Sequence, residues 1–141
     1  MKDEATQPAD RHGMSPYDTA LSSGLRFAIE IVAWVAGPWA AGELTGSGWA
    51  IVPALVVLIG LPALFNTPGD KKTTGIPTPG PVRILIEMLL LVAAIAGAWI
   101  VWPVWAATLV SVIGLAMVIT GRHRYQWLAT GAPAVASAGS N

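Results

Sequence analysis

Long uncharged runs of apolar residues alternate with short polar segments along this chain. The charged residues Glu30, Glu43, Asp70, Glu87 and Arg122 bound three of these runs. A charged side chain at the centre of a membrane helix costs about 2.5 to 3.5 kcal/mol on insertion scales, so membrane spans should fall between these positions. The pattern therefore predicts an integral membrane protein built from apolar helices.

The last uncharged run, Met88–Gly121, decides the number of spans. It contains about 34 residues, which at about 1.5 Å each make a helix of about 51 Å. One crossing of the hydrocarbon core needs about 30 Å, so the run must turn back once. Pro103 is its single proline and marks the turn. We therefore expect two spans, at about residues 82–102 and 104–121.

The first half of the chain predicts a matching pair of spans. The run between Glu30 and Glu43 is too short for a crossing unless its helix begins near Leu25. A span at about 25–41 results, and the next uncharged run gives a span at about 49–66.

The expected fold is an all-α integral membrane protein with four transmembrane helices arranged as two tandem helical hairpins. The transmembrane domain covers residues 25–122. We expect residues 1–24 to form a disordered cytoplasmic tail, and residues 123–141 to form a second cytoplasmic tail that is disordered at its end.

Composition and charge agree with a membrane location. The chain is 54% hydrophobic and 11% charged, whereas an average soluble protein carries about 25% charge. The net charge of zero argues against a nucleic-acid partner. All eight basic residues fall on one side of the predicted spans, which places both termini in the cytoplasm by the positive-inside rule. These residues are Lys2, Arg11, Arg26, Lys71, Lys72, Arg83, Arg122 and Arg124.

The two predicted hairpins begin with similar segments. Leu25–Glu30 matches Val82–Glu87, with an arginine and a glutamate four residues apart in each. Two hairpins related in this way would be parallel repeats, with a pseudo-twofold axis along the membrane normal.

Glu30 and Glu87 are the acidic residues inside the predicted spans, and an intramembrane carboxylate is a candidate functional group. Each lies one helical turn after an arginine, Arg26 or Arg83, so the spacing favours two ion pairs that help packing or an interface. A proton or cation site at these carboxylates is the alternative.

Other residues suggest packing and membrane contacts. Ala93 and Gly97 lie four apart, a spacing that lets helix backbones approach closely, either in packing inside the protein or at a docking face. Arg122 and Arg124 follow the last span and are expected to face anionic lipid headgroups or a partner. The chain has no cysteine, and neither histidine has a second ligand at metal-binding spacing. We therefore expect no catalytic residue, no metal and no cofactor.

The two repeated segments also carry a family resemblance. Leu25-Arg26-Phe27-Ala28-Ile29-Glu30-Ile31 and Val82-Arg83-Ile84-Leu85-Ile86-Glu87-Met88, with four short spans, resemble the YrdB-type small bacterial membrane proteins over about residues 24–122. That family implies the four-span fold and no particular activity. The cysteine-free composition, rich in Ala, Val, Gly and Trp, looks actinobacterial. Among such proteins the chain resembles the LucB-type accessory subunit of the mycobacterial Mce lipid importer.

Two functions follow as expectations. The first is a non-catalytic accessory subunit of the bacterial inner membrane that packs in the bilayer against a larger envelope transport complex, with Mce-type lipid import as the expected process. The second is a small proton-coupled exporter of cations or drugs, similar to the small multidrug resistance family, in which Glu30 carries the proton and Trp34 lies one turn away.

Overall fold

The computed structural model describes residues 18–66 and 76–130, and these are almost entirely helical. A two-residue parallel strand pair joins the end of the first hairpin to the start of the second. The elements in chain order are α1 (Ala20–Thr45), the 3-10 helix η1 (Gly48–Ala50), α2 (Ile51–Leu64), β1 (Phe65–Asn66), β2 (Ile76–Pro77), α3 (Gly80–Val101) and α4 (Val104–Thr130).

The expected all-helical fold is confirmed, with apolar helices of the kind that cross membranes. Helices α1, α3 and α4 are each long and apolar enough to cross a membrane. The fourth apolar helix, Gly48–Leu64, is shorter than these three.

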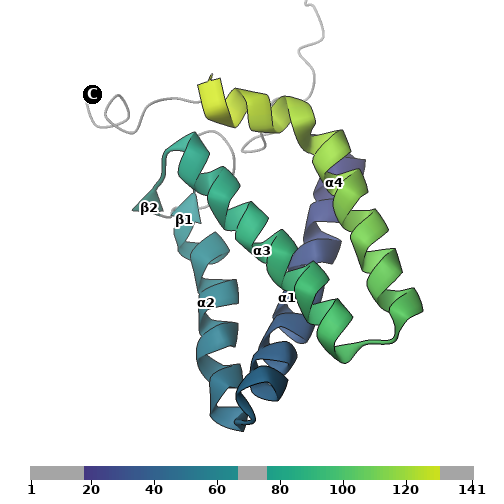
Figure 1. Cartoon of the computed structure of the whole chain (residues 1–141). Helices are drawn as coiled ribbons and strands as arrows, with labels where there is room; N and C mark the ends of the chain where they lie inside the picture. Colours follow the sequence, from purple (N-terminus) through teal and green to yellow (C-terminus); the bar gives the residue numbers. More distant parts are fainter. Residues whose placement is uncertain (1–17, 67–75, 131–141) are drawn as a thin grey trace, which may run out of the picture.

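The helices form two antiparallel hairpins (Figure 1). Helices α1 and α2 are joined through η1, and α3 and α4 are joined at Trp102 and Pro103, where the sequence predicted the turn. The most extensive packing is between α1 and α3, while α4 contacts both of them and α2 contacts mainly α1. The first helices of the two hairpins therefore form the centre of the bundle.

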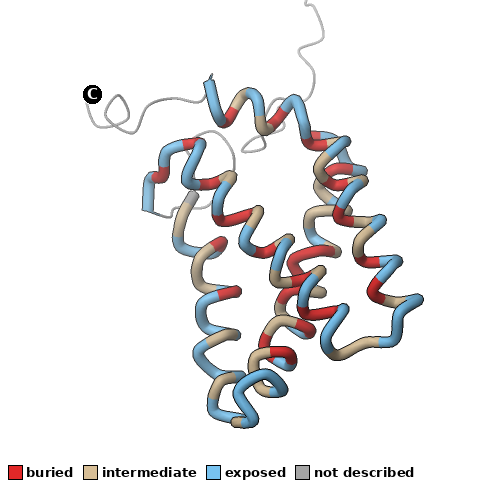
Figure 2. The backbone as a smooth tube through the Cα atoms, in the orientation of Figure 1, coloured by how far each residue is buried: buried red, intermediate tan, exposed pale blue. Residues whose placement is uncertain are grey.

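Small residues line the crossing of α1 and α3, where the buried positions concentrate (Figure 2). Gly97 lies against α1 so closely that a Cβ atom placed on it would be 2.7 Å from the backbone carbonyl of Ala36. One turn earlier, Ala93 faces Gly37, and its Cβ lies 3.7 Å from where a Cβ on Gly37 would be. The Ala93 and Gly97 spacing therefore serves a contact inside the bundle.

Both ends of the helical domain extend further than the sequence predicted. Helix α1 begins at Ala20 because Thr19 and Ser22 form a capping box that satisfies the first backbone N–H groups. Helix α4 runs on to Thr130. The predicted disorder is therefore wrong for residues 20–24, which are helical. Disorder was predicted for the end of the second tail, and that end lies outside the described residues, as do residues 1–17 of the first tail.

The last part of α4 bends and lies across the start of α3 (Figure 1). Near the bend, the Thr120 hydroxyl donates to the carbonyl of Ala116 at 2.8 Å, a back-bond that often bends helices. Gly80 packs directly on Leu128, because a Cβ on Gly80 would overlap the Leu128 carbonyl. Helix α4 therefore changes direction close to residue 121, where its membrane span was predicted to end.

Candidate functional site

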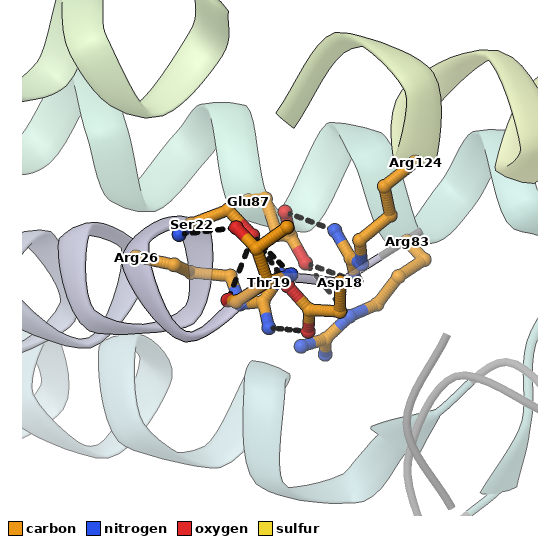
Figure 3. A network of polar contacts seen from close by, with 7 residues as sticks. All are labelled: Asp18, Thr19, Ser22, Arg26, Arg83, Glu87 and Arg124. Atoms are coloured by element: carbon orange, nitrogen blue, oxygen red, sulfur yellow. Dashed lines mark hydrogen bonds and ion pairs between the residues drawn. The ribbon is translucent and has the colours of Figure 1, made fainter. Parts of the chain in front are cut away.

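A cluster of buried charged residues lies where the start of α1, the start of α3 and the end of α4 meet (Figure 3). Its first part is built on the cap of α1. The Ser22 hydroxyl donates to Asp18 Oδ1 at 2.6 Å, and Arg26 Nη2 donates to Asp18 Oδ2 at 2.6 Å. Because Ser22 and Arg26 lie one turn apart on α1, they hold the two oxygens of one carboxylate.

The second part of the cluster joins α3 to α4. Arg124 donates two hydrogen bonds to Glu87, Nη1 to Oε2 at 2.9 Å and Nη2 to Oε1 at 2.8 Å. Arg83 approaches the same carboxylate, with its Nε 3.3 Å from Glu87 Oε1. All three side chains are at most 2% exposed. Glu87 is thus a buried carboxylate between two guanidinium groups.

Arg83 also connects this triad to the first hairpin. Its Nη1 donates to the carbonyl of Pro62 at 3.2 Å and to the carbonyl of Phe65 at 3.0 Å. These carbonyls lie at the end of α2, where no N–H group of a following helical turn donates to them. The helix dipole is also negative at this end, which favours a positive charge. The Arg83 side chain therefore caps α2 and ties it to α3.

The structure brings together one of the two predicted ion pairs. Arg83 and Glu87 contact each other as their spacing indicated. Arg26 does not bind Glu30, because its guanidinium group is bound to Asp18. Glu30 is buried, at 9% exposure, and its Oε1 has no hydrogen-bond partner among the described residues. The two repeated Arg-Glu segments therefore have different contacts.

Arg122 and Arg124, which were both expected at lipid headgroups, lie in different surroundings. Arg122 is exposed, as a headgroup contact requires. Arg124 is 2% exposed and binds Glu87, so the headgroup expectation is wrong for this residue. The bend of α4 explains the difference, because it turns the face that carries Arg124 towards α3.

Asp18, which precedes α1, has a lowered pKa in the folded protein. Burial by itself raises the pKa of Asp18, but the hydrogen bonds from Ser22 and Arg26 outweigh it and hold the pKa below the ordinary value of 3.8. Asp18 is therefore ionised at neutral pH and balances the charge of Arg26.

The chemistry of the cluster favours holding helices together. Taking ions out of water is costly, and removing one member of a buried pair typically costs about 3 to 5 kcal/mol because the other charge is left uncompensated. The paired carboxylates Asp18 and Glu87 both have their oxygens engaged by donors. Glu30 differs from both, because its Oε1 has no hydrogen-bond partner in the part of the chain that the structure describes.

Sequence reasoning missed Asp18, Ser22 and the inward position of Arg124. A local signal existed for the first two, since Thr19 and Ser22 have the spacing of a capping box and Asp18 precedes them. No pattern along the chain indicated that Arg124 would meet Glu87, because that contact depends on how α4 crosses α3.

Comparisons with protein-family models, with curated proteins and with solved structures find no match to this chain.

Proposed function

We propose that the protein is a four-span subunit of a bacterial inner membrane, with both termini in the cytoplasm. Arg26, Arg83 and Arg124 meet at one end of the bundle (Figure 3), which supports placing that end on the cytoplasmic side. Trp49 and Trp105, which are 86% and 73% exposed, follow the two hairpin turns at the other end. Exposed tryptophans at this position suit the opposite membrane interface.

Within this arrangement, the function that the geometry supports best is a non-catalytic accessory subunit that packs in the bilayer against a larger membrane complex. The observation that carries this proposal is the exposure of α2. Only Leu58 and Pro62 are buried in this apolar helix, and Val52, Val56 and Val57 are each about half exposed or more. An apolar helix so little covered by its own chain offers its surface to lipid or to another membrane protein.

The length of this helix favours a protein neighbour. Gly48–Leu64 is about 25 Å long at about 1.5 Å per residue, against a hydrocarbon core of about 30 Å. A short span is accommodated by thinning of the bilayer, by snorkelling of flanking residues or by association with other helices. Association with another helix would also cover the exposed apolar face of α2. We therefore propose association through α2.

The larger complex is proposed by resemblance to be an Mce-type lipid importer. The test is to extract the tagged protein from its native membrane in mild detergent and to measure the mass of the complex and its subunits. Val56→Trp should release the protein as a smaller species, because the added bulk lies on the exposed face of α2. Leu109→Trp on the exposed face of α4 is the matched control and should leave the complex intact. A free monomer or homo-oligomer from the unchanged protein would count against the proposal.

Proton-coupled cation transport is the second candidate, and Glu30 is the observation that favours it. Its carboxylate is buried and has an oxygen without a hydrogen-bond partner among the described residues, which leaves it available to a proton. Proton-coupled uptake of a cationic dye into proteoliposomes should then be lost in Glu30→Gln. Unchanged flux in both Glu30→Gln and Glu87→Gln would exclude this mechanism.

A further inference from the structure

Arg26 binds Asp18 and lies one helical turn before a second buried carboxylate, Glu30. Its Nη2 is 2.6 Å from Asp18 Oδ2, and its side chain is 12% exposed. Glu30 follows Arg26 by four residues in the uninterrupted helix α1, which is the spacing at which a guanidinium and a carboxylate meet on a helix surface. A change of rotamer would therefore carry Arg26 from Asp18 to Glu30 without movement of the α1 backbone.

The surroundings of Glu30 favour such an exchange. Glu30 is nine-tenths buried, and its Oε1 has no hydrogen-bond partner in the part of the chain that the structure describes. The narrow space beside it is lined by Arg26 and Glu87 together with apolar side chains, and it has no room for a water molecule. A buried acceptor without a partner is destabilising, and more so when it is charged. The arrangement with Arg26 on Asp18 therefore leaves a cost at Glu30 that the alternative arrangement would remove.

We propose that Arg26 is a switch residue that exchanges between Asp18 and Glu30. In the described state Asp18 holds Arg26 and Ser22, which fastens the residues before α1 to its first turns. In the other state Arg26 binds Glu30 inside the bundle, and Asp18 keeps only the hydrogen bond from Ser22. The exchange would therefore loosen the attachment of Asp18 to α1 while Arg26 keeps a carboxylate partner.

A double-mutant cycle in lipid nanodiscs tests the exchange through the melting temperature, Tm. If Arg26 can move to Glu30, Asp18→Asn should lower Tm by about 2 °C when Glu30 is present and by about 6 °C or more in the Glu30→Gln background. Glu30→Gln alone should change Tm by less than about 2 °C, since its Oε1 loses no bond. Glu43→Gln, at an exposed acid near the other end of α1, is the control background and should leave the effect of Asp18→Asn unchanged.

Additive effects of Asp18→Asn and Glu30→Gln would overturn the proposal, because they would show that Glu30 never receives Arg26. If Asp18→Asn protein cannot be purified, Ser22→Ala loosens the same carboxylate by removing one of its two donors. Its effect on Tm must then also grow in the Glu30→Gln background. An equal effect in both backgrounds contradicts the switch in the same way.

Discussion

The indole N–H of Trp34 donates to the backbone carbonyl of Leu58 at 3.0 Å, the carbonyl that Pro62 leaves without a helical partner. In a regular α-helix the N–H of residue 62 would bind the carbonyl of residue 58, and proline has no N–H to give. A side chain of α1 thus supplies the hydrogen bond that the sequence of α2 lacks. The two helices of the first hairpin are tied by this bond as well as by apolar contact.

Trp34→Phe should destabilise the protein by about 1 to 2 kcal/mol, because the carbonyl of Leu58 would be left without a donor in an apolar environment. Unfolding of the purified protein, followed as a function of temperature, measures this loss. Trp99→Phe is the matched control. It removes a hydrogen bond to Ser111 Oγ at 3.1 Å, but that hydroxyl keeps its own bond to the Ala107 carbonyl at 2.9 Å. Equal losses in the two variants would contradict the role given to Trp34.

The two glutamates of the predicted repeat should respond differently to the same substitution. Glu87→Gln should cost about 3 kcal/mol or more, because Arg83 and Arg124 would lose the buried charge that both of them contact. Glu30→Gln should cost less than about 1 kcal/mol. Denaturation of both variants in the same detergent gives the comparison.

A larger loss of stability in Glu30→Gln than in Glu87→Gln would contradict this account. It would show that Glu30, and not Glu87, is the carboxylate that stabilises the cluster. Arg122→Gln provides a further control for this pair of variants. It removes an exposed charge two residues before Arg124 and should leave stability nearly unchanged.

Gly97→Val should push α1 and α3 apart, because a Cβ at this position meets the backbone of Ala36 at 2.7 Å and of Gly37 at 2.9 Å. We expect a loss of about 3 kcal/mol or failure to fold. Gly24→Ala is the control, since a Cβ at Gly24 has no atom within 4 Å and alanine favours the helix by about 0.5 to 1 kcal/mol. Equal tolerance at both positions would mean that the two helices do not cross at Gly97.

Acid should weaken the cap of α1 through Asp18. Burial raises and hydrogen bonding lowers the pKa of Asp18, with a net value below 3.8 in the folded protein. Since the folded pKa is the lower one, the ionised carboxylate contributes stability that is fully present above pH 3.8 and is lost as the pH falls through the folded pKa. The difference in Tm between wild type and Asp18→Asn should therefore stay constant above about pH 5 and shrink as the pH falls below 3.8. A difference that already changes between about pH 7 and about pH 5 would show that the pKa of Asp18 is not lowered in the folded protein.

Much of the helical framework was predictable because it depends on where charges and prolines fall along the chain. The length of the run Met88–Gly121 required a turn, and Pro103 located it between Val101 and Val104, where the structure has it. The contact of Arg83 with Glu87 was predictable for the same reason, since both residues lie on one helix at a fixed spacing.

The contacts that define the buried cluster depend on information that the sequence pattern does not contain. Arg124 reaches Glu87 only because α4 bends and passes over α3, and the angle of a helix crossing follows from side-chain packing across both surfaces. Arg26 turns to Asp18 because the helix begins before Leu25, so a carboxylate from the cap competes with Glu30. The early start of α1 and the late end of α4 therefore account for the main differences between the predicted and the observed ion pairs.

The most direct test of the central proposal, that α2 docks in the membrane against a larger protein, is photo-crosslinking before any detergent is added. Val56 on α2 and Leu109 on α4 are both exposed apolar residues, so a benzoylphenylalanine can be placed at either position in native membranes. We predict that Val56 gives an adduct with one defined larger membrane protein, while Leu109 gives lipid adducts. Lipid adducts alone from Val56, under conditions in which the protein is abundant and folded, would contradict the account.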